Sequence, residues 1–421
     1  MALAVSIVFI VVLLVIALEK IHRTKVAMIG AGIVLIMGGI TEEHAIEAVD
    51  WGTIGLLAGM MLIVAVTQRT GIFTYIAVRA AQLSRGEAWR LVFILAFTTG
   101  ILSGFLDNLT AILLVVPITL LLADVLRLPA IPLVLLLIIA SNIGGAATLI
   151  GDPPNILIGS AVPELSFMDF IINLAPIAFI SLFIVTGAIY LVLRSRLKIA
   201  PEDAAEVAKL QPGKDLQGSP NLKRAIAVVI GTVIGFFLHS QLGLEPWVIA
   251  LAGATVMLLV AVDDIEEALG GIEWATLFFF MALFVMVGAL EQQGIIESIA
   301  ELVADASGDS SVREGMIVLW TAAAGSAVVD NIPFTAAMIP VVEELQREKE
   351  QFDDGTWWAL ALGASFGGNA TIIAAAANVA ATGVMAKAGH PVSFLRFMLI
   401  GIPATIISLI LATIYLLLFQ L

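Results

Sequence analysis

Long apolar runs separated by short polar segments dominate the chain. About 17–25 residues are needed for a helix to cross the hydrocarbon core of a bilayer. Ten runs meet or approach this length: 2–18, 25–40, 51–68, 130–160, 170–193, 223–239, 246–262, 274–290, 356–386 and 396–420. The pattern predicts ten spans and an all-α polytopic membrane protein.

Two further apolar regions are interrupted in the middle by an acidic residue. Residues 88–126 contain Asp107-Asn108, and residues 311–346 contain Asp330-Asn331. Each region is either a re-entrant hairpin that enters and leaves on one side, or a pair of full crossings.

A constant shift of 223 positions aligns the two halves of the chain without a gap. The shift pairs Trp51 with Trp274, Asp107 with Asp330, Asn108 with Asn331, Pro117 with Pro340, Thr148 with Thr371 and Asn155 with Asn378. Internal repeats of this kind are typical of transporter folds. The sequence therefore predicts a first repeat at 1–196, a cytoplasmic linker at 197–222 and a second repeat at 223–421.

Composition excludes several classes of protein. Apolar residues make up 60% of the chain and charged residues 13%, whereas a soluble domain averages about 45–50% and about 25%. The net charge of −14 argues against a broad basic surface for nucleic acid. The chain has no cysteine, so disulfides, thiolate nucleophiles and Cys metal sites are excluded. No nucleotide-binding or zinc motif is present, which predicts a transporter driven by an ion gradient or by a separate subunit, and no enzyme.

The basic residues predict the orientation, because Lys and Arg favour cytoplasmic loops. If both Asp-Asn regions are re-entrant, each half has five spans and the second repeat is inverted. With both termini outside, 17 of the 20 basic residues then face inward. Full crossings would give six spans a half and a parallel repeat, an alternative that charge bias weakens without excluding. We expect a multi-pass protein of a prokaryotic inner membrane.

Three acidic residues fall within apolar segments. Charges are costly in hydrocarbon, so Asp107, Asp152 and Asp330 are functional candidates. They could titrate or bind a coupling cation. Alternatively, Asp107 and Asp330 could cap half-helices through turn chemistry, and Asp152 could be an N-cap before Pro153.

Two equivalent segments predict unwound transmembrane helices. SNIGGAATLIGDPPNILIG spans 141–159, and ASFGGNATIIAAAANVAATG spans 364–383. Glycine permits close backbone approach, proline interrupts helical hydrogen bonds, and Asn and Thr supply neutral donors and acceptors. Asp152-Pro153-Pro154 corresponds to three alanines in the second copy, so one half is expected to carry the ion chemistry.

With these motifs the sequence resembles the ion transporter superfamily, in particular its arsenical pump and P-protein branch. The resemblance implies two inverted repeats, each with a re-entrant hairpin and a broken helix, organised as a scaffold and a transport domain in a homodimer. It implies solute binding by Asn108, Ser141, Asn142, Thr148, Asn155, Asn331, Gly368, Asn369, Thr371 and Asn378, and coupling-ion binding by Asp107, Asp152 and Asp330. No cofactor is implied beyond a proton or sodium ion.

The hairpin tips bear on the solute. Dicarboxylate carriers of the superfamily have Ser-Asn-Thr where this chain has Asp-Asn, and the added negative charges disfavour a dianion. Arsenite is an uncharged trihydroxide that oxygen and amide groups can bind. The leading hypothesis is proton-coupled efflux of arsenite or antimonite. The alternatives are a sodium/proton antiporter, an anion or dicarboxylate carrier, and a membrane subunit that docks a soluble ATPase.

Overall fold

The structure is a computed structural model that describes residues 1–18, 20–200, 202–203, 205, 207, 221–308, 310–347 and 353–421. The predicted linker at 197–222 lies mostly outside these residues. Within the described ranges all regular structure is helical and there is no strand, which confirms the predicted all-α class.

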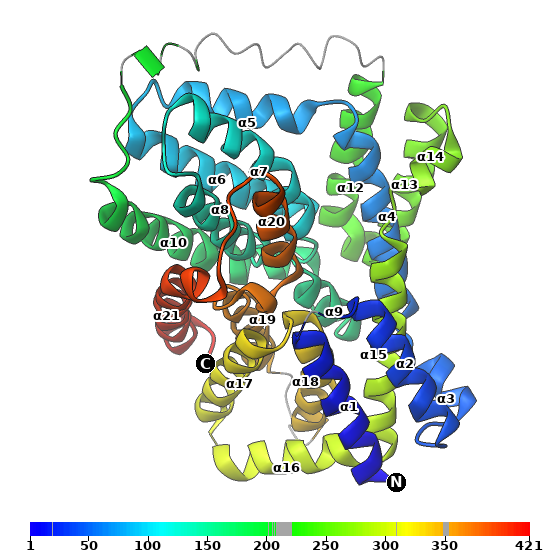
Figure 1. Ribbon diagram of the computed structural model, residues 1–421. Coiled ribbons are helices and arrows are strands. Elements are labelled where there is room, and N and C mark those ends of the chain that lie inside the picture. The colour runs from blue at the N-terminus through cyan, green and yellow to red at the C-terminus, as the bar shows by residue number, and fades with distance from the viewer. Residues whose placement is uncertain are drawn as a thin grey trace.

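The helices follow one another in the same order in both halves (Figure 1). The first half has α1 (Ala2–Ala17), α2 (Arg23–Ile36), α3 (Glu42–Glu47), α4 (Trp51–Gln68), α5 (Ile72–Leu83), α6 (Ala88–Leu106), α7 (Asn108–Val125), α8 (Ala130–Gly145), α9 (Pro153–Ala161) and α10 (Phe167–Leu193). The second half has α12 (Leu222–Leu242), α13 (Pro246–Ala261), α14 (Ile265–Leu269), α15 (Trp274–Gln292), α16 (Ile295–Ser307), α17 (Ser311–Val328), α18 (Asn331–Arg347), α19 (Asp354–Gly367), the 3-10 helix η2 (Ile372–Ala374), α20 (Ala376–Lys387) and α21 (Phe394–Phe419).

Seven helical segments of the described chain are long and apolar enough to cross a membrane. They are Glu42–Gln68, Ala88–Leu106, Asn108–Val125, Phe167–Leu193, Leu222–Leu242, Trp274–Gln292 and Phe394–Phe419. Other predicted spans form shorter apolar helices, such as α1 and α13. Each arm of the α6–α7 pair has the length of a full crossing, so the re-entrant course of this pair stays a prediction.

The apolar runs at 130–160 and 356–386 are each divided into two helices, as the Gly-rich segments predict. In the first half, α8 ends at Gly145 and α9 begins at Pro153. A Cβ on Gly151 would lie 2.5 Å from the carbonyl oxygen of Gly145, so the chain between these helices folds back closely on itself. The second break needs no proline: Thr371 and Ala375 have extended backbones on either side of η2.

Helices related by the shift of 223 begin at equivalent residues. Helices α4 and α15 begin at Trp51 and Trp274, and α7 and α18 at Asn108 and Asn331. Each of these helices packs against a helix of the other half, and its equivalent makes the reciprocal contact. Helix α4 packs on α13 and α15 packs on α2; likewise α7 packs on α20 and α18 packs on α9. Such reciprocal contacts are those of a two-fold arrangement. The inverted orientation of the second copy stays a prediction.

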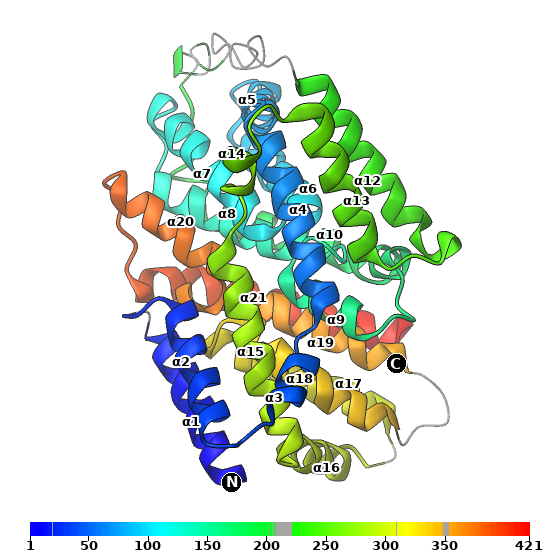
Figure 2. The same cartoon turned by 90° about the vertical axis from the view of Figure 1, so that its right-hand side faces the viewer.

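Two bodies position the site. The first consists of α1–α4 and α12–α15, and we call it the wall. It faces the viewer in Figure 2. Behind it lies the core body, which consists of α6–α10 and α17–α21. The wall meets the core body where α4 packs on α9 and α15 packs on α18. Helices α5 and α16 lie at opposite ends of the molecule (Figures 1 and 2).

Close backbone contact between α6 and α8 makes Gly144 sensitive to substitution. A Cβ there would overlap the backbone of Gly100, and overpacking of this kind costs about 1–3 kcal/mol or more. We expect Gly144→Ala to lower the stability of the purified protein by that amount in thermal unfolding in detergent micelles. Gly32→Ala is the matched control, since a Cβ on Gly32 has no neighbour within 4 Å. Equal stability of the two variants would contradict the prediction.

Candidate transport site

The two tip aspartates make different bonds. Asp107 lies between α6 and α7 with φ 102°, a strained conformation for a residue other than glycine. Its two carboxylate oxygens accept from the backbone N–H and the hydroxyl of Thr110, both at 2.7 Å. Asp330 instead accepts from the backbone N–H of Ile332 at 3.0 Å and from Arg23 Nη1 at 3.0 Å. The capping interpretation therefore describes the bonds of Asp107, and Asp330 has an additional partner on the wall.

Asp152 lies where the two tips meet. It is fully buried and occupies the N-cap position of α9, yet its side chain accepts no hydrogen bond from that helix. Its Oδ1 accepts instead from Asn108 Nδ2 at 3.0 Å and from Asn331 Nδ2 at 3.5 Å. Asparagines at equivalent positions of the repeat thus converge on a carboxylate that exists in the first half alone.

Asn142 joins the halves on the other side of Asn108. Its Oδ1 accepts from Asn108 Nδ2 at 3.1 Å, and its Nδ2 donates to Asn369 Oδ1 at 3.0 Å and to Asn378 Oδ1 at 2.9 Å. Together with Asp152 and Asn331 these residues form a buried polar network, which we call the amide cage. Its members are Asn108, Asn142, Asp152, Asn331, Asn369 and Asn378.

The amide cage retains unused binding capacity. Among the described residues, the buried side-chain atoms without a partner at hydrogen-bond distance include Asp152 Oδ2 and Asn369 Nδ2 of the cage. The buried Ser365 hydroxyl, also without such a partner, lies close enough to Asp152 to interact with its carboxylate. Buried polar groups are nearly always paired, so an unpaired carboxylate oxygen indicates a site for a ligand or ion. No cluster of three or more His, Asp or Glu side chains in the described part of the chain could hold a metal ion.

Other predicted site residues support the backbone of the breaks. The Thr148 hydroxyl donates to the Gly104 carbonyl, and the equivalent Thr371 hydroxyl donates to Ala327 at 2.8 Å. Asn155 Nδ2 donates to the Thr148 carbonyl at 2.8 Å. The two threonines fasten each break to the neighbouring helix, and Asn155 ties the first break to α9.

The second break is fastened in the same way. Asn378 Nδ2 donates to the carbonyls of Thr371 and Gly368 at 2.8 and 2.7 Å. Ser141 bonds within its own helix through its hydroxyl, and its carbonyl accepts from Ser103 at 2.6 Å. Ser103 and Arg23 are site residues that the sequence motifs do not predict. The pairing of Ser103 with Ser326 at the repeat shift was an available signal for the first, whereas Arg23 has the sequence context of a loop charge.

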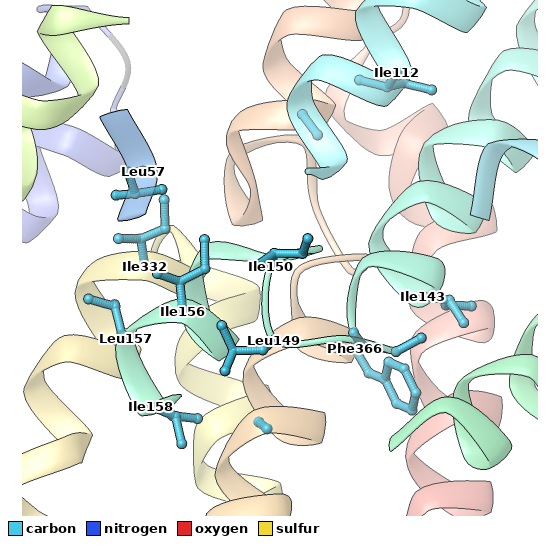
Figure 3. Close-up of a cluster of buried hydrophobic side chains, with 14 of the residues drawn as sticks. Leu57, Ile112, Ile143, Leu149, Ile150, Ile156, Leu157, Ile158, Ile332 and Phe366 are labelled. Atoms are coloured by element: carbon cyan, nitrogen blue, oxygen red, sulfur yellow. The ribbon is translucent and has the colours of Figure 1, made fainter. Parts of the chain in front are cut away.

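Residues of the described ranges line three cavities between the wall and the core body. The smallest, which we call the site pocket, has a volume of about 40 Å³ and is lined by Asn108 and Asn331 of the cage. Leu57, Ile150, Ile156 and Ile332 supply part of its apolar lining, and Figure 3 shows these side chains around the first break. Its size suits an ion or a very small solute.

The two larger cavities are lined by equivalent positions of the repeat. One, which we call the vestibule, has a volume of about 650 Å³ and is lined by Ile21, Arg23 and Glu273. The other, of about 440 Å³, is lined at the equivalent positions by Leu244, Pro246 and Asp50. The vestibule is lined by the tip residues Leu109 and Asp330. The other cavity is lined by residues near the C-terminal end of α9, among them Gly159 and Ser160.

Long apolar helices, paired broken helices and a buried polar cage between them define a polytopic membrane transporter, not an enzyme. The family model for citrate transporters, CitMHS, matches residues 13–363. The chain belongs to this family.

Its relatives extend over nearly the whole chain. An uncharacterized transporter of Mycobacterium tuberculosis is 37% identical over 415 residues, covering 97% of this chain and 96% of the relative. The human P protein is 32% identical over 489 residues, covering 95% of this chain and 58% of the P protein. This confirms the resemblance to the P-protein branch.

A solved structure shows the same fold. The YdaH transporter of Alcanivorax borkumensis, described as having an unusual topology, matches with a TM-score of 0.54 and 14% identity over 89% of this chain and 86% of that chain.

Proposed function

We propose that the protein is a secondary active transporter in which Asp152 binds the coupling cation. The observation that carries this proposal is the unpaired, fully buried Oδ2 of Asp152, placed where the two helix tips converge. A buried carboxylate is costly unless it is paired or neutralised. A proton or sodium ion would neutralise it, and release of that ion would be favourable only when the site opens to water.

The expected orientation has support in the two surface helices at opposite ends of the molecule. Helix α5 carries Arg79, whereas its equivalent α16 carries Glu297, Glu301 and Asp305. Basic residues favour the cytoplasmic side, so we assign the α5 end to the cytoplasm. Both termini are then outside, and the vestibule, which is lined by the loop between α1 and α2, opens inward.

Arsenite or antimonite is our leading proposal for the solute, exported by alternating access. The amide cage offers neutral oxygen and nitrogen groups, which suit an uncharged trihydroxide, and the site pocket is small. Citrate is a second candidate because the family model describes citrate transporters.

The purified chain in proteoliposomes tests these proposals. We expect an imposed proton or sodium gradient to drive uptake of radiolabelled or mass-detected arsenite, with no ATP and no soluble subunit. Gradient-driven citrate uptake without arsenite uptake would transfer the function to the second candidate. If added sodium changes the pH inside the proteoliposomes while neither arsenite nor citrate is taken up, the protein is a sodium/proton antiporter. Absence of any gradient-driven flux would overturn the assignment of Asp152 as a coupling site.

A further inference from the structure

An ion pair joins the wall to the core body beside the transport site. Arg23 is the first residue of α2 in the wall, and Asp330 directly precedes α18 in the core body. Their side chains meet at 3.0 Å and are 19% and 8% exposed. The pair therefore forms between two bodies whose relative position must change in alternating access.

The second half is built for this contact in a way that the first half is not. The partner of Asp107 in its own half is Thr110, whose position corresponds to Pro333 in the second half. Proline has no N–H and no hydroxyl, so it can replace neither hydrogen bond of Thr110, and one oxygen of Asp330 is left for the guanidinium. In the other half, Pro246 stands at the position that corresponds to Arg23, so Asp107 meets no equivalent cation.

The wall holds Arg23 in place through other contacts. Its guanidinium lies over the Phe279 ring at 5.0 Å from the centroid, a favourable cation–π arrangement. The neighbouring Thr24 hydroxyl donates to the Ala275 carbonyl at 2.7 Å, which fastens the start of α2 to α15. The cation is therefore a fixed feature of the wall, against which the tip of α18 rests.

Arg23 lies at the boundary between two of the cavities. It lines both the site pocket, which contains Asn108 and Asn331, and the larger vestibule. Asp330 lines the vestibule, and the next residue in the chain, Asn331, bonds to Asp152. The ion pair therefore lies at the boundary between the two cavities, which Leu109, Glu273, Thr276 and Ala376 also line on both sides.

We propose that the Arg23–Asp330 ion pair is the gate between the vestibule and the transport site. While the pair is formed, the tip of α18 stays against the wall and the site pocket is closed to the vestibule. When it breaks, the pocket opens and the core body is free to move. The other cavity has Pro246 in place of the arginine, so this position offers no cation for an equivalent gate. That a solute passes this gate rests on the proposed function. Opening of the gate, however, can be measured in the absence of any solute.

The absence of cysteine allows a direct measurement of access. Met61 lines the site pocket, whereas Ala380 lines the vestibule, so Met61→Cys reports on the site and Ala380→Cys is the control for general exposure. The measurement is the rate at which a water-soluble methanethiosulfonate reagent modifies each cysteine in the purified, solute-free protein. We expect Arg23→Gln to raise the rate at Met61→Cys about tenfold, as expected when a charge-assisted hydrogen bond no longer favours the closed state. The rate at Ala380→Cys should not change.

Two further variants make the test specific to the ion pair. Lys25→Gln removes a cation from the same turn of α2, where Lys25 is exposed, and should leave both rates unchanged. The exchanged pair Arg23→Asp with Asp330→Arg should restore slow modification at Met61→Cys. The gate is disproved if Arg23→Gln leaves the Met61→Cys rate unchanged, or if both cysteines become faster together, which would indicate general loosening. A faster Met61→Cys rate in a protein that transports neither candidate solute would support the gate and reject the proposed solutes.

Discussion

Asp152→Asn is expected to reduce gradient-driven transport by about 10–100-fold while the protein still folds. The amide has the shape of the carboxylate, and its oxygen can still accept from Asn108 and Asn331, which donate to Asp152 Oδ1. The unpaired Oδ2 is replaced by a neutral donor, so the site loses its charge for a cation. Interactions with a charged group contribute about 1.5–3 kcal/mol, and each 1.4 kcal/mol corresponds to a factor of about ten. The measurement is initial flux in proteoliposomes under a fixed gradient.

Asp124→Asn is the matched control for this experiment. Asp124 lies near the end of α7 and is exposed, so its neutralisation should leave flux unchanged. Full flux with Asp152→Asn, with the same dependence on pH and sodium, would remove Asp152 from the coupling mechanism. Asp107→Asn is not expected to reduce flux in the way that Asp152→Asn does. Both oxygens of Asp107 already accept hydrogen bonds from Thr110, and its side chain lies outside the amide cage.

The repeat and the broken helices could be predicted because their determinants are local. Gly144, Gly145 and Asp152-Pro153 stand within an otherwise apolar run, and the chain must leave the helix there. The same is true of the tips, where a charged residue interrupts two long apolar segments. These signals lie in short stretches of sequence, and the paired glycines and the Asp-Asn tips recur at one constant shift, so the positions of the elements follow directly.

The direction in which each polar side chain points could not be predicted. Asn155 and Asn378 have the composition and spacing of solute ligands, but they donate to carbonyls of the two breaks. An unwound segment leaves backbone carbonyls without partners, and a nearby amide satisfies them before any solute does. The number and placement of those carbonyls depend on the backbone conformation of the break, which the sequence does not specify.

Contacts between residues far apart in the sequence could not be predicted either. Arg23 and Asp330 are 307 positions apart, and nothing in the loop around Arg23 distinguishes it from the basic residues that set membrane orientation. Comparison of the two halves now supplies the missing signal. Thr110 and Pro333 differ at one equivalent position, and Pro246 and Arg23 at another. Such paired differences between repeats indicate where an otherwise symmetric fold has acquired a contact of its own.

Asn142→Ala is expected to cause the largest loss of stability. Asn369 Oδ1 and Asn378 Oδ1 both accept from Asn142 Nδ2, and all three residues are fully buried. Truncation leaves two buried acceptors without that donor, at about 1–3 kcal/mol each, so we expect the free energy of unfolding to fall by about 2–6 kcal/mol. Thermal and denaturant unfolding in detergent micelles would measure the change.

The comparison that isolates this effect uses a buried polar group that has no partner to lose. Ser181 is fully buried in α10, and its hydroxyl makes no hydrogen bond, so Ser181→Ala should leave stability unchanged or raise it slightly. Asn142→Asp should be at least as harmful as Asn142→Ala, because it removes the donors and adds a buried charge beside Asp152. If Asn142→Ala and Ser181→Ala unfolded alike, the link between the halves would be apolar packing, and the amide cage would serve the ligand alone.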